Sequence, residues 1–244
     1  MAPTPSTKTV LRPDERAIVL INVFTVPPGG QDAFAETQIG EYRRLGFSAT
    51  GSLSVNLHRG LGPDARLANV AQFRDLESYA AWRASDAFRE HGEIIRPLFV
   101  RAEPGIYRVR HALARPASSA DAAPIEPGRF ARIHLAHAEA GDRARLLEAQ
   151  ADAARRLLGR GDGPISVTLL EGIERPAPAG PPGPGGVRDV NHTLAAYFLC
   201  ESRAAAEALG SDPAFRAAFS EGAGARAVLS EPFEVVFVQS QAAS

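Results

Sequence analysis

Two stretches of the chain are similar: SVNLHRG at residues 54–60 and SVTLLEG at residues 166–172 share four of their seven residues and are 112 positions apart. Two more pairs follow in the same order. SDAFR at 85–89 matches SDPAFR at 211–216, and the Glu-Pro at 103–104 matches the Glu-Pro at 231–232. Between the first two pairs the second copy carries an extra Pro/Gly-rich stretch, APAGPPGPGGVRDV. The sequence therefore predicts that one supersecondary unit has been duplicated.

The first copy reads as a βαββαβ unit. An apolar run predicts a buried central strand, near-helical spacing of apolar residues predicts a helix, and strict alternation predicts a strand with two different faces. The second copy repeats this order with the Pro/Gly-rich stretch between its middle strands. The expected elements of the first copy are strands 17–26, 52–58, 67–73 and 105–111, a helix at 31–45 and a second helix from 75 or 76 through 82, with helical residues continuing to about 98 after a break near Ser85. Those of the second are strands 129–136, 165–170, 192–199 and 233–239 with helices 142–158, 202–209 and 214–218.

The predicted fold class is α+β, with two tandem ferredoxin-like repeats. We expect their sheets to pack face to face as a pseudo-dimeric α/β barrel within one chain, because each sheet has one face that no helix covers. The expected organisation is a flexible arm at 1–16, a first repeat with the functional cavity at 17–111, a linker at 112–128, and a degenerate second repeat at 129–240. The cavity is expected between the two sheets.

Composition excludes several classes of function. The 244 residues carry a formal net charge of −1, which argues against a nucleic-acid partner. The single cysteine, Cys200, allows no disulfide or thiolate cluster within the chain. The N-terminus has no apolar signal core, and no apolar run reaches the ~18 residues of a membrane span. We therefore expect a cytoplasmic protein that has no membrane partner.

Two amides interrupt strands that are otherwise apolar. Asn22 lies in the first predicted strand and Asn69 in the third. An unpaired buried amide costs roughly 1–3 kcal/mol, so a role in a cavity competes with simple pairing at a bulge or strand end. Neither amide is retained in the second copy, where sequence alignment places Ile133 and Ala195.

The second helical region of the first copy carries the only tryptophan, Trp82, together with Tyr79, Arg89 and His91. Such aromatic side chains suit a flat ligand, although core packing is the more common role of a helical aromatic. The second copy has Ala205, Ala208 and Ala218 opposite Tyr79, Trp82 and His91. This inequality predicts that the first copy carries the function.

Histidines offer one further candidate. His58 ends the alternating strand on its polar face, where an imidazole serves either as an acid or base or as an exposed strand end. His134, His137 and His192 lack the spacing of a zinc site, so no metal is expected. The chain has no G-x-S-x-G, P-loop or dinucleotide fingerprint, which disfavours the common nucleophilic and nucleotide-using enzymes.

The stretch NVAQFRDLESYAAWRASDAFREH at residues 69–91 resembles the antibiotic biosynthesis monooxygenase superfamily of dimeric α/β barrels. Asn69, Tyr79 and Arg89 match substrate-contacting positions of its anthrone- and quinone-forming oxygenases, and Phe73 stands where those enzymes have a tryptophan. Tandem copies in one chain resemble the oxygenases that open the B ring of angucyclines. The same stretch is also similar to the haem-degrading branch, where Asn22 and Trp82 match motif positions and His91 comes one residue early.

The resemblance implies oxygenation of an aromatic polyketide by O₂ without a metal. Under it, Asn69, Trp82, His91 and His58 are the catalytic candidates, and Asn22, Phe73, Tyr79 and Arg89 are the substrate-binding ones. No tightly bound cofactor is expected. Reduced flavin supplied by a flavin reductase could serve as the electron donor, and haem is less favoured as a cofactor. The chain could also form a homodimer. The alternatives are a haem-degrading monooxygenase, a polyketide cyclase, and a stress-response barrel without catalysis.

Overall fold

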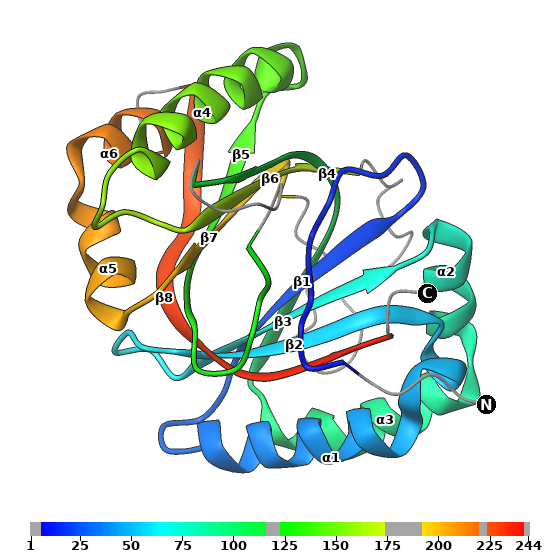
Figure 1. Ribbon diagram of the computed structural model, residues 1–244. Helices are drawn as coiled ribbons and strands as arrows, with labels where there is room; N and C mark the ends of the chain where they lie inside the picture. Colours follow the sequence, from blue (N-terminus) through cyan, green and yellow to red (C-terminus); the bar gives the residue numbers. More distant parts are fainter. Residues whose placement is uncertain (1–5, 116–122, 174–191, 220–223, 242–244) are drawn as a thin grey trace.

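The computed structural model describes residues 6–115, 123–173, 192–219 and 224–241, which form a closed antiparallel barrel with helices outside it (Figure 1). The first repeat comprises β1 (Ile18–Thr25), α1 (Gln31–Thr50), β2 (Ser52–Gly60), β3 (Arg66–Phe73), α2 (Leu76–Ala84), α3 (Asp86–Ile95), the 3₁₀ turn η1 (Arg96–Leu98) and β4 (Arg101–Ala114). The second comprises β5 (Phe130–Ala138), η2 (Ala140–Asp142), α4 (Arg143–Leu158), β6 (Ser166–Gly172), β7 (Leu194–Cys200), α5 (Arg203–Ala208), η3 (Leu209–Ser211), α6 (Pro213–Phe219) and β8 (Ala225–Ser240).

The strand order around the barrel is β1-β3-β2-β8-β5-β7-β6-β4. Each repeat therefore contributes four consecutive strands in the same internal order, and the predicted fold class is confirmed. Figure 1 shows α1–α3 and α4–α6 on opposite outer sides of the barrel. Within the described residues, no helix combines the length and apolar character needed to cross a bilayer.

The two repeats are joined by their long last strands. The first half of β4 pairs with β1, and from Tyr107 onward β4 pairs with β6 of the other repeat. In the same way β8 pairs first with β5 and then, from Phe233 to Ser240, with β2. Both strands begin earlier than the sequence predicts. The expected strands start directly after the Glu-Pro pairs, whereas Pro104 and Pro232 lie inside the observed ladders. This exchange closes the barrel without a free sheet edge.

The barrel interior is filled by apolar side chains from both repeats. On β1 the interior residues are Val19, Ile21 and Val23, and the alternation of a strand turns Asn22 to the outer face, under the helices. Asn69 is directly opposite Asn22 on β3 and shares that face. The expectation that Asn22, Asn69 and Trp82 line a hollow between the sheets is therefore wrong, since these residues lie between the sheet and the helices.

The segment before β1 is held in place, in contrast to the flexible arm expected at residues 1–16. Ser6 pairs with Ser240, and Thr9 pairs with Ile125 from the stretch expected as a linker. Leu11 and Ile125 are both buried in the interior cluster of the barrel. In Figure 1 the N-terminal stretch passes beside the segment that precedes β5. The described part of the arm thus contributes to the core.

Candidate functional site

Polar side chains gather between α1–α3 and the outer face of the first repeat's sheet, a region called here the first layer. Its polar members are Asn22, Gln38, Glu41, Tyr42, Asn69, Trp82 and His91. The carboxamide oxygens of Asn22 and Asn69 are buried and have no hydrogen-bond partner among the described residues. Because buried polar atoms are normally hydrogen-bonded, these two facing oxygens are available to a ligand or to water.

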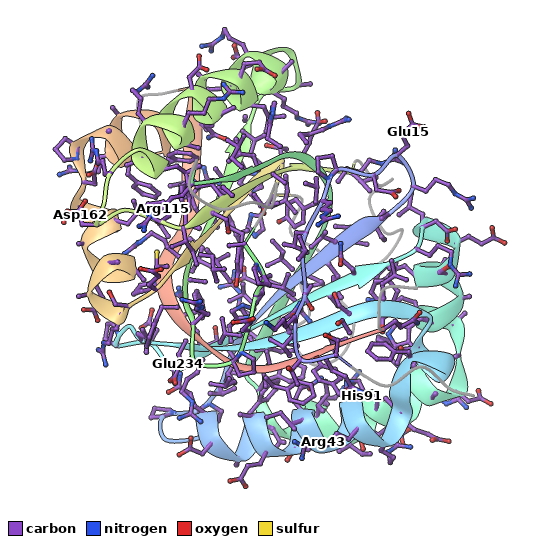
Figure 2. The ribbon with its side chains drawn as sticks, in the orientation of Figure 1. Glu15, Arg43, His91, Arg115, Asp162 and Glu234 are labelled. Atoms are coloured by element: carbon purple, nitrogen blue, oxygen red, sulfur yellow. The ribbon has the colours of Figure 1, made fainter. Side chains whose placement is uncertain are left out.

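A hydrogen-bonded chain runs through the first layer. His91 is 6% exposed, and its Nδ1 lies 3.3 Å from Oε2 of Glu41 while its Nε2 lies 3.3 Å from Nε2 of Gln38. In this arrangement Nδ1–H donates to the carboxylate and the amide of Gln38 donates to Nε2, so the imidazole is neutral. Figure 2 shows His91 among the side chains between α1 and the barrel wall. The chain therefore consists of a carboxylate–imidazole pair, Glu41 and His91, whose second ring nitrogen contacts the side-chain amide of Gln38.

The charges of this pair are set by their surroundings. Arg44 donates two hydrogen bonds to Glu41, of 2.8 and 2.7 Å, which is the main reason that the pKa of Glu41 lies below its usual value. Burial lowers the pKa of His91, and the Glu41 carboxylate opposes that shift. Near neutral pH the layer therefore holds an anionic Glu41 beside a neutral His91 that is able to accept a proton.

Aromatic rings surround the imidazole. Tyr42 stacks between His91 and Phe237, with ring centroids 6.4 and 6.1 Å apart, and Phe237 comes from β8 of the other repeat. Trp82 lies 6.4 Å from His91 and meets Phe88 edge to face at 5.4 Å. Burial raises the pKa of the Tyr42 hydroxyl, which stays protonated. The layer thus combines packed aromatic rings with a few hydrogen-bonding groups, the residue types that typically line small-molecule sites.

The break between α2 and α3 places His91 in this layer. Asp75 caps α2 by accepting from the backbone N–H of Ser78 at 2.8 Å, and Ser85 ends that helix and caps α3 by accepting from Phe88 N–H at 3.1 Å. Ser85 is extended, with ψ of 154°, so α3 starts in a new direction. The Ser-Asp pair that marks the repeat is therefore a helix cap that orients His91 toward α1.

Four of the predicted site residues lie in this layer as two pairs: Asn22 faces Asn69 in the β1–β3 ladder, and Trp82 lies 6.4 Å from His91. Phe73 and Tyr79 lie in the same apolar cluster as Tyr42, against which Trp82 packs, and contact each other edge to face at 5.2 Å. Their assigned roles stay predictions. The sequence analysis did not single out Gln38, Glu41 or Tyr42 as site residues. The missed signal was polar residues on the buried face of α1, at the spacing of Phe34, Gln38, Glu41 and Tyr42.

Two other predicted site residues lie elsewhere. His58 is fully buried inside the barrel, on the opposite face of the sheet, where its Nε2 accepts from the Tyr197 hydroxyl at 2.9 Å. Burial lowers the pKa of His58 to about 4. Arg89 points to solvent with a 66% exposed side chain and pairs with Asp86 at 2.7 Å. Two residues of helix separate Arg89 from His91 by about 200°, which explains its outward direction.

The residues of the second repeat that match Asn22 and Asn69 in the structure lie one position away from those expected from the sequence. Asn22 is opposite Asn69 in the β1–β3 ladder, and the matching pair in the β5–β7 ladder is His134 opposite Ala196. Ile133 and Ala195, which sequence alignment had placed there, belong to the barrel interior. A one-residue offset changes the face of a strand completely, so the sequence correspondence missed His134.

Metal-binding side chains do not cluster in the part of the chain that the structure describes. No group of three or more His, Cys, Asp or Glu residues there is placed to hold a metal ion. Cys200 is buried, and burial raises the pKa of its thiol to about 12. The reactive features of the described residues are therefore the amides, the aromatic rings and the His91–Glu41 pair.

Residues 17–93 match the protein family described as antibiotic biosynthesis monooxygenase. This match extends from β1 through most of α3 and contains every polar member of the first layer. No curated protein matches the chain in sequence.

Three solved structures share the fold over nearly the whole chain. An anthrone oxidase-like protein is 19% identical with a TM-score of 0.69, covering 94% of this chain and 95% of that one. A protein of Fusobacterium nucleatum described as a monooxygenase is 10% identical, with a TM-score of 0.60 and coverages of 93% and 95%. Another so described, from Lactobacillus acidophilus, is 10% identical, with a TM-score of 0.56 and coverages of 93% and 97%. The double-repeat barrel is thus an architecture found in other single chains.

Proposed function

We propose that the first layer binds a flat, polycyclic aromatic polyketide and promotes its oxygenation by O₂ without a metal. The observation that carries this proposal is the Glu41–His91–Gln38 chain, in the same helix–sheet layer as the facing Asn22 and Asn69, whose carboxamide oxygens have no partner among the described residues. The family match of residues 17–93 and the fold shared with an anthrone oxidase-like protein support the reaction class.

His91 is the proposed proton acceptor. An anthrone or hydroquinone becomes electron-rich enough to react with O₂ once it loses a proton, and neutral imidazole is a suitable base near neutral pH. The Glu41 carboxylate stabilises the imidazolium that forms, and Arg44 keeps Glu41 ionised. The substrate hydroxyl takes the place of the Gln38 amide N–H at Nε2 when it gives up its proton, and after a rotation Gln38 Oε1, which has no partner among the described residues, accepts from the protonated ring.

The amides of Asn22 and Asn69 and the indole N–H of Trp82 are the proposed donors to the substrate's oxyanion. A side-chain amide presents either its oxygen or its NH₂ after a rotation, so Asn22 and Asn69 can turn donors toward a phenolate. Donors held in a site without water stabilise developing charge more strongly than donors in water. Trp82 and Tyr42 supply flat surfaces for the rings.

The reaction balances for an anthrone with O₂ alone. One oxygen atom becomes the new carbonyl of the anthraquinone, and the other leaves as water with the two hydrogens of the substrate's CH₂ group. The substrate itself supplies the electrons. Opening of an angucycline ring needs two further electrons, which reduced flavin from a flavin reductase would supply. We therefore favour the anthrone or hydroquinone class.

Oxygen uptake with 1,8-dihydroxyanthrone, followed together with quinone absorbance, tests the proposal. We expect His91→Ala and Glu41→Gln to lower kcat. His111→Ala is the matched control, because His111 also pairs with a glutamate, Glu148 at 3.2 Å, outside the first layer. Unchanged turnover in both first-layer variants would refute the proposal.

The same samples separate the alternatives. A cyclase would convert its substrate without oxygen uptake. A haem enzyme would give a strong band near ~400 nm on addition of haem. For His91 to become an axial ligand, iron would have to displace Gln38 from its Nε2 or Glu41 from its Nδ1.

A further inference from the structure

Each repeat sends one ring-bearing side chain across the joint, under the helices of the other repeat. On β8, which pairs with β2, Phe237 is opposite Leu57. On β4, which pairs with β6, His111 is opposite Leu169. The two leucines are 112 residues apart, which is the offset of the sequence repeat, so Phe237 and His111 occupy equivalent places. The two rings differ in what they contact.

Phe237 lies against the first layer, although it comes from the second repeat. It packs against the apolar clusters that contain Tyr42 and the first turns of α1. Its ring stacks on Tyr42, and the guanidinium of Arg43 lies 5.6 Å from its centroid, within the range of a cation–π contact. His111, in contrast, pairs with Glu148, whose side chain is 70% exposed. One crossing ring therefore reaches the proposed site, and the other lies near the surface.

Tyr42 connects Phe237 to His91. The planes of Tyr42 and His91 are 27° apart, and those of Tyr42 and Phe237 are 23° apart. Centroid separations of 6.4 and 6.1 Å are those of offset stacking. A stacked neighbour resists tilting of a ring out of its plane. Tyr42 can resist a tilt of His91 only while Tyr42 itself is held, and Phe237 is stacked on it.

The hydrogen bonds of His91 alone define its orientation loosely. Its Nδ1 contact with Glu41 and its Nε2 contact with Gln38 are both 3.3 Å, whereas such bonds are usually about 2.7–3.2 Å. Both partners come from α1. Contacts at the two nitrogens leave the ring able to tilt about the line that joins them, so the aromatic neighbours must fix its plane.

We infer that Phe237 is a positioning residue for His91 and acts through Tyr42. The inference rests on the proposed function, in which Nε2 of His91 takes a proton from the substrate. Phe237 holds Tyr42 against the imidazole, and the imidazole then keeps the direction of its lone pair that proton transfer needs. The second repeat is thus part of the catalytic machinery, although the hydrogen-bonding groups of the site belong to the first.

NMR of the histidine rings tests the positioning and needs no substrate. The ring current of Tyr42 shifts the Cε1–H and Cδ2–H signals of His91, which are assigned by their loss in His91→Ala. Phe237→Leu keeps apolar volume but removes the ring, so we expect these signals to move toward those of an unstacked histidine. Phe237→Tyr keeps the ring and should leave them in place. His111→Leu, at the equivalent place on β4, is the matched control and should leave them unchanged.

Oxygen uptake with 1,8-dihydroxyanthrone gives the second readout. Phe237→Leu should lower kcat ~10-fold and change KM less than ~2-fold, because a misplaced base slows proton transfer while Phe237 has no proposed contact with the substrate. Phe237→Tyr should retain the wild-type rate, and so should His111→Leu. In a Tyr42→Leu background, Phe237→Leu should have no further effect, since the path through Tyr42 is already broken.

The outcomes distinguish this inference from the proposed function. A wild-type protein that takes up no oxygen would refute the oxygenase, and the NMR comparison would still decide whether Phe237 orients His91. Arg43→Gln, a surface substitution that removes the cation from the Phe237 ring, should move the His91 signals in the same direction by less. Unchanged His91 signals in Phe237→Leu or, if that variant does not fold, in Arg43→Gln would overturn the inference. An equal effect of Phe237→Leu with and without Tyr42 would overturn it as well.

Discussion

The two repeats share one scaffold and differ in what they bury between helices and sheet. The first layer buries an ionised carboxylate, an imidazole and amides among aromatic rings. The layer between α4–α6 and the outer face of β5–β7, called here the second layer, is an apolar cluster of alanine, leucine and phenylalanine interrupted by His134 and Gln150. Both repeats provide strands for the same closed barrel. The comparison indicates that the barrel and outer packing stabilise the fold, while the choice of buried polar groups determines the chemistry of each repeat.

The largest expected effect would come from removing the imidazole of the first layer. His91→Ala should lower kcat for anthrone oxidation by ~10²–10⁴-fold, the usual contribution of a general base. The outer helices are retained, so circular dichroism should be unchanged. Added imidazole should restore part of the rate if the lost group is a base. If oxygen uptake were as fast in His91→Ala as in the wild type, His91 would not be the base, and the proposed chemical difference between the two layers would be wrong.

A second prediction concerns stability at acid pH. Burial lowers the pKa of His58, in the first repeat, and of His134, in the second, to about 4. The unfolded chain therefore binds more protons than the native protein between about pH 6.5 and 4, and stability is lost as the pH falls through this window. Each histidine should account for roughly 3 kcal/mol of that loss.

Urea unfolding at pH 7 and pH 4.5 measures this difference. His134→Leu should remove about half of the loss that the two histidines cause. The variant should therefore lose less stability than the wild type on acidification, whatever its stability at pH 7. An equal loss in both proteins would mean that His134 is accessible to protons in the native state.

The repeat order and the fold class could be predicted from sequence because alternation, helical spacing and repeated caps are local signals. The face of a residue was harder to predict. The alignment chose Ile133 over His134, and one position decides whether a side chain enters the barrel or the second layer. The Glu41–His91 contact joins residues 50 positions apart across two helices, so no local pattern could show it.

The pH profile of the first layer gives a smaller effect with a definite sign. His91 must be neutral to accept a proton, and its pKa lies below the usual value, so kcat should rise with pH through that pKa and then level off. Glu41 holds the pKa of His91 up. Glu41→Gln should therefore move the rising limb to lower pH and lower the plateau. A limb that moves to higher pH would contradict the proposed pairing.

Gln38 and Gln150, which the 112-residue offset relates, give the smallest and most direct comparison. Gln38 donates to His91, so Gln38→Leu removes a buried hydrogen bond and should reduce the free energy of unfolding by about 1 kcal/mol. Gln150 has no partner among the described residues, so Gln150→Leu should raise it by a similar amount when no ligand is present. Thermal unfolding of both variants measures the opposite signs.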